Sequence, residues 1–364
     1  MTPPGPAPQP HAPRQLSLDV LRTFSILLVL GRHTADIPAL PEPAATVLST
    51  LHCGGWIGVD LFFVLSGFLV SGLLFDEHAR TGHLRPGRFL LRRAFKIYPA
   101  FYAMIALSIL AIARRGPLPV KSVLAEVLFF QNYTWGLWPH TWSLAVEEHF
   151  YLFLPALLLV LLRLNRGARD PFRLVPAIWL AMAALLLGLR CLNLTRPFGL
   201  STHLMATHLR IDSLMLGVAI AWLFRRRPEV IAALQRHRSR VGLVGAALLA
   251  PAFIFELART PFIWTAGYLE FALGAGLILI ALHGALPPNP LTRALAFVGA
   301  RSYSIYVWHM PLRFWISDKL AARLGLGFLG SSLLFCVSSI ALGIGMAALL
   351  EQPMLRLRDR LVSV

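Results

Sequence analysis

The sequence contains few charged residues and very few acidic ones. Only 14% of its 364 residues are charged, and 17 Asp and Glu stand against 34 Lys and Arg. Its three cysteines are scattered and form no Cys-x-x-Cys pair, so we expect neither a disulfide framework nor a zinc cluster. No glycine-rich phosphate loop, His-Glu-x-x-His or Gly-x-Ser-x-Gly motif occurs. These absences disfavour metal-dependent hydrolysis and covalent serine catalysis.

The residues present in excess are apolar. Hydrophobic residues make up 57% of the chain and its mean hydropathy is +0.65, which is too apolar for a water-soluble domain of this length. We therefore predict an all-α fold, a polytopic transmembrane bundle of about ten helices. The predicted spans lie near 16–34, 55–76, 97–113, 142–164, 174–190, 204–224, 241–257, 262–282, 302–317 and 327–350.

The segments between these spans are too short for a second domain. We expect one transmembrane domain over residues 16–353, a disordered, proline-rich cytoplasmic tail over 1–15 and a basic cytoplasmic tail over 354–364. The first span ends in Arg32-His33-Thr34 rather than in small residues. A cleaved signal peptide is therefore not expected.

The basic residues predict an orientation. With the N-terminus in the cytoplasm and the spans alternating, most of the 34 Lys and Arg fall on the cytoplasmic side, many of them in 77–96 and 225–240. This asymmetry predicts that both termini are cytoplasmic and that the chain is a multi-pass protein of the inner membrane. The excess positive charge then serves orientation and attraction to anionic lipids, and it does not indicate nucleic-acid binding.

Arg22 and His33 are the most informative pair in the sequence. Eleven residues bring both side chains to one face of the first helix, roughly 16 Å apart along its axis. Ionisable groups inside a membrane are costly and are functional candidates by default. The alternative is that Arg22 extends to the interface while His33 ends the helix.

Other polar residues fall in the outer half of the predicted bundle. Lipid cannot solvate them, so we expect them to face one another or a wet cavity and to form a polar chamber with His33. They are Asp60, Ser66, Trp142, Ser143, Glu147, Glu148, Arg210, Asp212 and His309.

Several of these residues also have ordinary interpretations. Arg210 and Asp212 are two residues apart and point in different directions, so each is expected to bond to another span. Glu147 and Glu148 are adjacent, so at most one should point inward. Ser66 precedes a glycine at a place suited to close helix packing, and Trp142 is equally suited to anchoring at the membrane interface.

A basic segment opens the third predicted helix. Arg93 and Lys96 are three residues apart and therefore neighbours on a helix, and Arg92 precedes them. Anions are favoured at a helix N-terminus, so this segment is a candidate phosphate clamp. The alternative is a positive-inside flank without a ligand.

Seven segments in order resemble acyltransferase family 3, a family of integral-membrane O-acyltransferases. They are Leu18-Asp19-Val20-Leu21-Arg22 with His33, Gly58–Leu69, Arg92–Pro99, Thr141–Tyr151, Arg210-Ile211-Asp212, Ser302–Pro311 and Glu351-Gln352-Pro353. The resemblance implies transfer of an acyl group, usually acetyl, from cytoplasmic acyl-CoA to a hydroxyl of an extracytoplasmic sugar. The sequence departs from the family pattern at Lys96, where the second Arg of Arg-x-x-Arg is usual, and at His149, where Gln is common.

We expect a mechanism in which acetyl-CoA is a co-substrate and no cofactor or metal is bound. Arg92, Arg93 and Lys96 would hold the nucleotide, and the pantetheine arm would pass Arg22. His33 would act as general base.

A carboxylate would orient His33, with Glu147 the first choice and Asp60 the second. Direct transfer and an acyl intermediate on His33 both stay open. The acceptor would be a sugar or glycan, free or lipid-linked, in a surface polysaccharide, a glycolipid or a secreted glycoside. The rival interpretation is a proton-coupled transporter of a sugar or lipid-linked intermediate.

Overall fold

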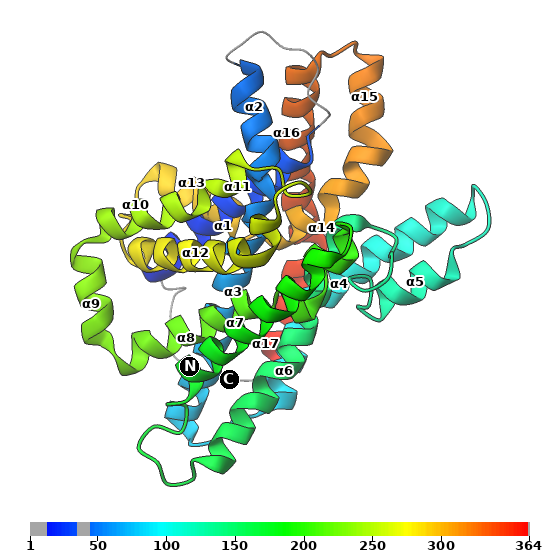
Figure 1. Cartoon of the computed structure of the whole chain (residues 1–364). Helices are drawn as coiled ribbons and strands as arrows, with labels where there is room; N and C mark the ends of the chain where they lie inside the picture. The colour runs from blue at the N-terminus through cyan, green and yellow to red at the C-terminus, as the bar shows by residue number, and fades with distance from the viewer. Residues whose placement is uncertain (1–12, 35–43, 363–364) are drawn as a thin grey trace.

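The computed structural model describes residues 13–34 and 44–362, so most of the expected N-terminal tail lies outside the described residues. Every regular element in these two ranges is helical, and Figure 1 shows their arrangement. The α-helices are α1 Pro13–Arg32, α2 Ala44–Gly54, α3 Gly58–Thr81, α4 Pro86–Ala113, α5 Val120–Val127, α6 Trp142–Leu164, α7 Val175–Leu192, α8 Ile211–Arg226, α9 Pro228–Arg236, α10 Arg238–Leu249, α11 Pro251–Ile254, α12 Tyr268–Leu282, α13 Pro290–Gly299, α14 Ser302–Leu312, α15 Asp318–Arg323, α16 Phe328–Met346 and α17 Gln352–Leu361.

Six helical segments within the described ranges are long and apolar enough to cross a membrane, and each overlaps a predicted span. They are Ser49–Thr81, Pro86–Ala113, Pro139–Leu164, Val175–Thr195, Ile263–Leu282 and Phe328–Leu361. The other four predicted spans are also helical, but their helices are charged, short or broken. Pro13–Arg32 carries several charges, α8 has only 16 residues, α10 stops before Pro251, and α14 gives way to a π-helical turn.

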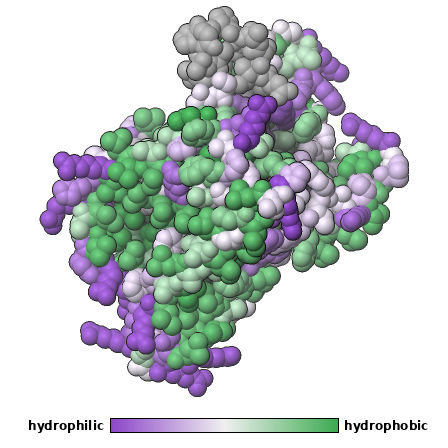
Figure 2. Space-filling view, viewed as in Figure 1, coloured by the Kyte–Doolittle hydropathy of each residue, from purple (hydrophilic) through white to green (hydrophobic). Residues whose placement is uncertain are grey.

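Some helices leave apolar faces outside the protein core. Only 22% of the most apolar window of Val175–Thr195 is buried within the protein, and Leu180, Leu185 and Leu192 are exposed there. Figure 2 shows apolar side chains over much of the visible face, with hydrophilic ones mainly at its left, lower and right margins. Such an apolar band is what a surface in contact with lipid requires.

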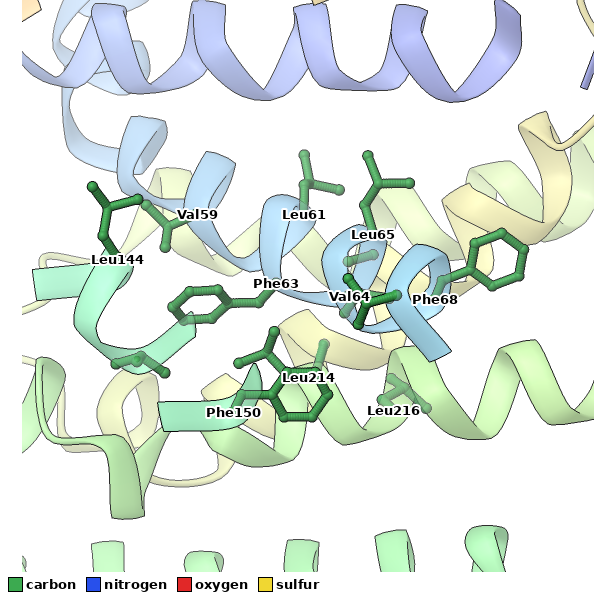
Figure 3. Close-up of a cluster of buried hydrophobic side chains, with 14 of the residues drawn as sticks. Val59, Leu61, Phe63, Val64, Leu65, Phe68, Leu144, Phe150, Leu214 and Leu216 are labelled. Carbon is green, nitrogen blue, oxygen red and sulfur yellow. The ribbon is translucent and has the colours of Figure 1, made fainter. Parts of the chain in front are cut away.

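The core is organised around α3, which packs between α1 and α8. Figure 3 shows Leu61 and Leu65 on the side of α3 toward α1, with Phe63 and Val64 toward α8. The crossing of α3 and α8 depends on two glycines. A Cβ on Gly67 would collide with a backbone carbonyl of α8, and one on Gly217 would collide with a carbonyl of α3. The predicted close packing beside Ser66 is thus confirmed.

Several helices pack around α1 and the site described below. α1 packs against α3, α13 and α14, and α14 also contacts α4 and α16. α13 begins with a capping box between Asn289 and Thr292 and ends at Gly299. A Cβ on Gly299 would collide with the carbonyl of Asp19, so this glycine lets α13 end directly against α1.

Helices extend past both ends of the expected transmembrane domain. α1 begins at Pro13, inside the expected tail, since proline is well suited to a first helical turn. The expected basic tail over 354–364 is largely helical, because α17 extends to Leu361 and packs against α4. Arg92 of α4 donates to the carbonyl of Val362 at 3.0 Å and holds this end of the chain in place.

Candidate active site

Two adjoining hollows form the candidate site. The central cavity lies between α1, α3, α4, α6 and α14, and the basic cleft lies between α1, α3, α4 and α17. The central cavity has a volume of about 320 Å³, and the basic cleft beside it has a volume of about 760 Å³. Arg22, Arg93 and Lys96 line both hollows. The basic cleft is also lined by Arg80, Arg88, Arg92 and Arg358. A polyanion in the cleft would thus sit at the entrance of the central cavity.

The four predicted donor-binding cations differ in their partners. Arg22 pairs with Asp19, one turn earlier in α1, and Arg92 lies 3.6 Å from Asp359. Lys96 pairs with Glu351. These three positive charges are therefore partly neutralised by the protein itself.

Arg93 differs from the other three because it makes no hydrogen bond or ion pair within the described part of the chain. Its guanidinium lies 5.7 Å from the ring centroids of Phe89 and Tyr151. Aromatic faces attract a cation without removing its capacity for hydrogen bonds to an anion. Arg93 is therefore the cation best prepared to bind a phosphate where the two hollows meet.

Lys96 also belongs to a polar network that connects three parts of the chain. Its partner Glu351 is only 3% exposed and accepts a further hydrogen bond, 2.8 Å long, from Ser304 Oγ. Glu351 closes a π-helical turn, Ala347–Glu351, and π-helical turns often occur at functional sites. The network joins α4, α14 and the turn before α17.

Glu147 of α6 lines the central cavity. Its carboxylate accepts a hydrogen bond from Tyr151 Oη at 3.0 Å, and Ser66 Oγ lies 2.8 Å from the same hydroxyl. Glu148 does not line the cavity and accepts a bond from Tyr98 Oη at 3.2 Å. The prediction that only one of the two glutamates points inward is confirmed.

A pair of hydroxyl groups forms another part of the cavity wall. Ser143 Oγ lies 2.7 Å from Tyr306 Oη, and Tyr306 donates its proton to the backbone carbonyl of His140. Ser143 must then donate to Tyr306, because a phenol has only one proton. The ring of Tyr306 lies 5.5 Å from that of His140 and 5.6 Å from that of His309.

Three histidines meet behind this hydroxyl pair. His309 Nε2 lies 3.3 Å from His33 Nδ1, and the rings of His309 and His140 are 4.8 Å apart. His309 is 0% exposed and His140 is 3% exposed, whereas His33 is partly exposed. The expectation that His33 and His309 come together is confirmed, and the polar surroundings of His33 are a histidine cluster.

The expected carboxylate partner of His33 is not found. Among the described residues, the ring of His33 bonds to the carbonyl of Val29 and to His309, and neither Glu147 nor Asp60 contacts it. The reason is that both carboxylates have other partners. Glu147 bonds to Tyr151, and Asp60 bonds to Arg210 at 2.6 Å.

Arg210 and Asp212 belong to a separate buried network rather than to the cavity wall. Asp212 pairs with Arg190 of α7 at 2.6 Å, and the guanidinium of Arg210 lies 3.9 Å from the ring centroid of Tyr268. The four charged residues of this network are each at most 1% exposed. They are Asp60, Arg190, Arg210 and Asp212. Arg210 and Asp212 thus each bond to another helix, as their spacing predicts.

Trp142 is buried and is not an interfacial anchor. It is 8% exposed, and its ring meets that of Phe63 edge to face with centroids 5.9 Å apart. It lies 5.7 Å from the guanidinium of Arg210. Phe63, which lines the central cavity, lies 5.8 Å from the same guanidinium, so both rings pack against the buried Asp60–Arg210 pair.

Sequence reasoning missed His140, which lies in the short helical turn before α6. The signal was its position two residues before Trp142, next to a segment already singled out. The loop leading to it is held by Glu126, which accepts a 2.9 Å bond from the amide of Leu137, and by Gln131, which donates to the carbonyl of Thr141 at 3.0 Å. Burial raises the pKa of Glu126 to about 7.

The site thus combines a cationic cleft, an adjoining cavity and a histidine cluster behind the cavity wall, among helices that include several apolar enough to cross a membrane. Residues 15–348 match the acyltransferase domain of acyltransferase family 3, and the chain belongs to this family. The resemblance found in the sequence is thus confirmed.

Two relatives show the range of similarity. The chain is 28% identical over 326 residues to the peptidoglycan O-acetyltransferase OatA of Listeria monocytogenes, a match that covers 81% of this chain and 49% of that protein. It is 26% identical over 329 residues to the O-acetyltransferase OatA of Staphylococcus aureus, covering 83% and 51%. The chain spans about half the length of these relatives. No solved structure gives a significant match.

Proposed function

We propose that the protein transfers an acetyl group from cytoplasmic acetyl-CoA to a hydroxyl of an extracytoplasmic sugar or glycan. The observation that carries this proposal is the central cavity. It adjoins the basic cleft at Arg93 and is walled elsewhere by Tyr306, which packs against the histidine cluster. A long donor with an anionic head and a thin arm matches this shape. Of the residues that we expected to bind the acceptor, three lie at this site. Ser66 and Ser143 line the central cavity, and His309 belongs to the histidine cluster beside it.

The donor's charge supports its placement. The nucleotide end of acetyl-CoA carries several phosphate charges and would stay in the basic cleft, with Arg93 as its main contact and Arg92 at the rim. The pantetheine arm would enter the central cavity past Arg22. Tyr151 and Glu147 offer hydrogen-bonding groups to its amides. Tyr306 and Ser143 would then lie near the thioester.

His33 is the proposed general base. Its imidazole removes the proton from the acceptor hydroxyl as the hydroxyl oxygen attacks the thioester carbonyl carbon. The carbon–sulfur bond then breaks, and the departing thiolate takes the proton from His33. Transfer through an acetyl group on His33 is the other route, and it uses the same residues.

The proposed setting is the inner membrane, with about ten spans, both termini in the cytoplasm and anionic lipids at the basic loops. The acceptor approaches from the opposite face, where His33 is partly exposed. Because one relative is named a peptidoglycan O-acetyltransferase, peptidoglycan fragments are the first acceptors to offer. Lipid-linked sugars and secreted glycosides come next.

A proton-coupled transporter is the alternative function. The experiment that separates the two offers purified protein acetyl-CoA together with each glycan, and follows free CoA and acetylated glycan by mass spectrometry. The proposal expects both products in equal amounts. Uptake of unmodified sugar into vesicles, with no release of CoA above the protein-free rate, would support the transporter instead.

Arg93→Ala should weaken donor binding through KM. Losing a charge-assisted hydrogen bond costs about 1–3 kcal/mol, and kcat should change little. A short acetyl thioester without the nucleotide should be used equally well by both proteins. Arg240→Ala is the matched control, since Arg240 is exposed and lines neither hollow. Equal penalties for both donors would show that Arg93 does not contact the nucleotide.

The proposed orientation can be tested by labelling. In a variant without Cys53, Cys191 and Cys336, a cysteine at Arg88 should resist a membrane-impermeant maleimide added outside intact cells. A cysteine at Arg115, on the predicted outer side, should react with it. Labelling of the cysteine at Arg88 before lysis would reverse the topology, and with it the side from which the donor enters.

A further inference from the structure

The backbone around His33 determines where its ring carries a proton. Nδ1 of His33 lies 3.0 Å from the carbonyl oxygen of Val29. A carbonyl oxygen can only accept a hydrogen bond, so Nδ1 must be the protonated nitrogen. In the neutral ring, Nε2 is then unprotonated and is the nitrogen with a free lone pair.

The same reasoning applies to His309. Its Nδ1 lies 2.6 Å from the carbonyl oxygen of Tyr306 and must also carry a proton. The Nε2 lone pair of neutral His309 therefore faces His33 Nδ1, 3.3 Å away. The single proton on His33 Nδ1 is thus shared between the carbonyl of Val29 and the ring of His309. The protonation states assigned to the two histidines are therefore compatible.

The ring of His309 is held firmly in this position. It is 0% exposed and packs against the rings of His140, Tyr306 and Phe335, at 4.8, 5.6 and 6.4 Å between centroids. His140 is itself oriented, because its Nε2 lies 3.3 Å from the carbonyl of Val307. His309 therefore has little freedom to turn its Nε2 away from His33.

We propose that His309 is a positioning residue that holds His33 with Nε2 as its reacting nitrogen. This inference rests on the proposed function and deepens it. When Nε2 takes the proton of the acceptor hydroxyl, the Nδ1–H of His33 donates to the neutral ring of His309. His309 thus takes the place that a carboxylate holds in a catalytic triad.

Two substitutions of His309 distinguish a positioning role from a packing role. Glutamine can place an acceptor oxygen near the position of the His309 Nε2 atom, whereas phenylalanine fills the ring volume without any acceptor. We expect His309→Phe to lower kcat by roughly 10- to 100-fold, the range found when the hydrogen-bond partner of a metal-binding histidine is removed. KM for acetyl-CoA should stay unchanged, and His309→Gln should recover most of the lost kcat. Equal losses in both variants, or no loss in either, would overturn the positioning role.

The protonation of His33 can be measured without substrate. In protein labelled with ¹⁵N-histidine and placed in lipid nanodiscs, the His33 signals are those that disappear in His33→Gln. We expect the unprotonated signal to belong to Nε2 in the wild type and this preference to weaken in His309→Phe. An unprotonated Nδ1 would overturn the inference even if acetyl transfer is observed. The expected signals without any acetyl transfer would overturn the proposed function alone.

Discussion

His33→Ala is expected to abolish acetyl transfer while the protein still inserts and folds. A positioned general base contributes about 10²- to 10⁴-fold to a rate, and the alanine side chain cannot take the proton of the acceptor hydroxyl. His33 packs against His309 but is partly exposed, so its removal should cost little stability. The measurement is the rate of acetylated glycan formation by purified, monodisperse protein.

His237→Ala is the matched control, because His237 is exposed and lies outside both hollows and the histidine cluster. The control should retain full activity. If well-folded His33→Ala protein turned over at a near-normal rate, His33 would not be the base. The base would then have to be sought on the cavity wall, with Glu147 first.

Asp60→Ala should have the largest effect on stability. Arg210 is 0% exposed, and its ion pair with Asp60 is 2.6 Å long. Removing one partner of a buried pair leaves an uncompensated charge and costs about 3–5 kcal/mol. We therefore expect a large loss in the free energy of unfolding, measured in detergent, and a low yield of folded protein.

An exposed ion pair provides the control for this prediction. Glu256 and Arg259 lie 3.1 Å apart with side chains 57% and 83% exposed. Glu256→Ala should change stability by less than about 1 kcal/mol, as is usual for surface pairs. If Asp60→Ala were as stable as Glu256→Ala but inactive, the Asp60–Arg210 pair would belong to the reaction rather than to the fold.

Helix geometry in the sequence predicted those parts of the site that depend on one helix alone. The eleven-residue spacing placed Arg22 and His33 on one face of α1 at two depths, and the structure puts Arg22 at the two hollows and His33 in the histidine cluster. The two-residue spacing of Arg210 and Asp212 correctly predicted partners on other helices. These predictions depend only on helical periodicity, which can be read directly from the spacing of residues in the sequence.

Contacts between helices could not be predicted from the sequence. Depth along a span does not determine which side chain lies opposite, so the partner of His33 was expected to be Glu147 or Asp60 rather than His309. Lys96 and Glu351 are 255 residues apart, and nothing local indicates that they pair. The shorter and broken spans were also hard to delimit, because turns such as Arg313–Ser317 interrupt apolar segments without leaving a polar gap.

The central claim is that donor and acceptor meet across the membrane at His33. Proteoliposomes with oriented protein test it directly, with ¹⁴C-acetyl-CoA confined to the side of the basic cleft and peptidoglycan fragments or lipid-linked sugars to the other. The account predicts labelled acetyl-glycan on the acceptor side and none with His33→Ala. Label on the glycan only when donor and acceptor share one side, or equal transfer by His33→Ala, would contradict it.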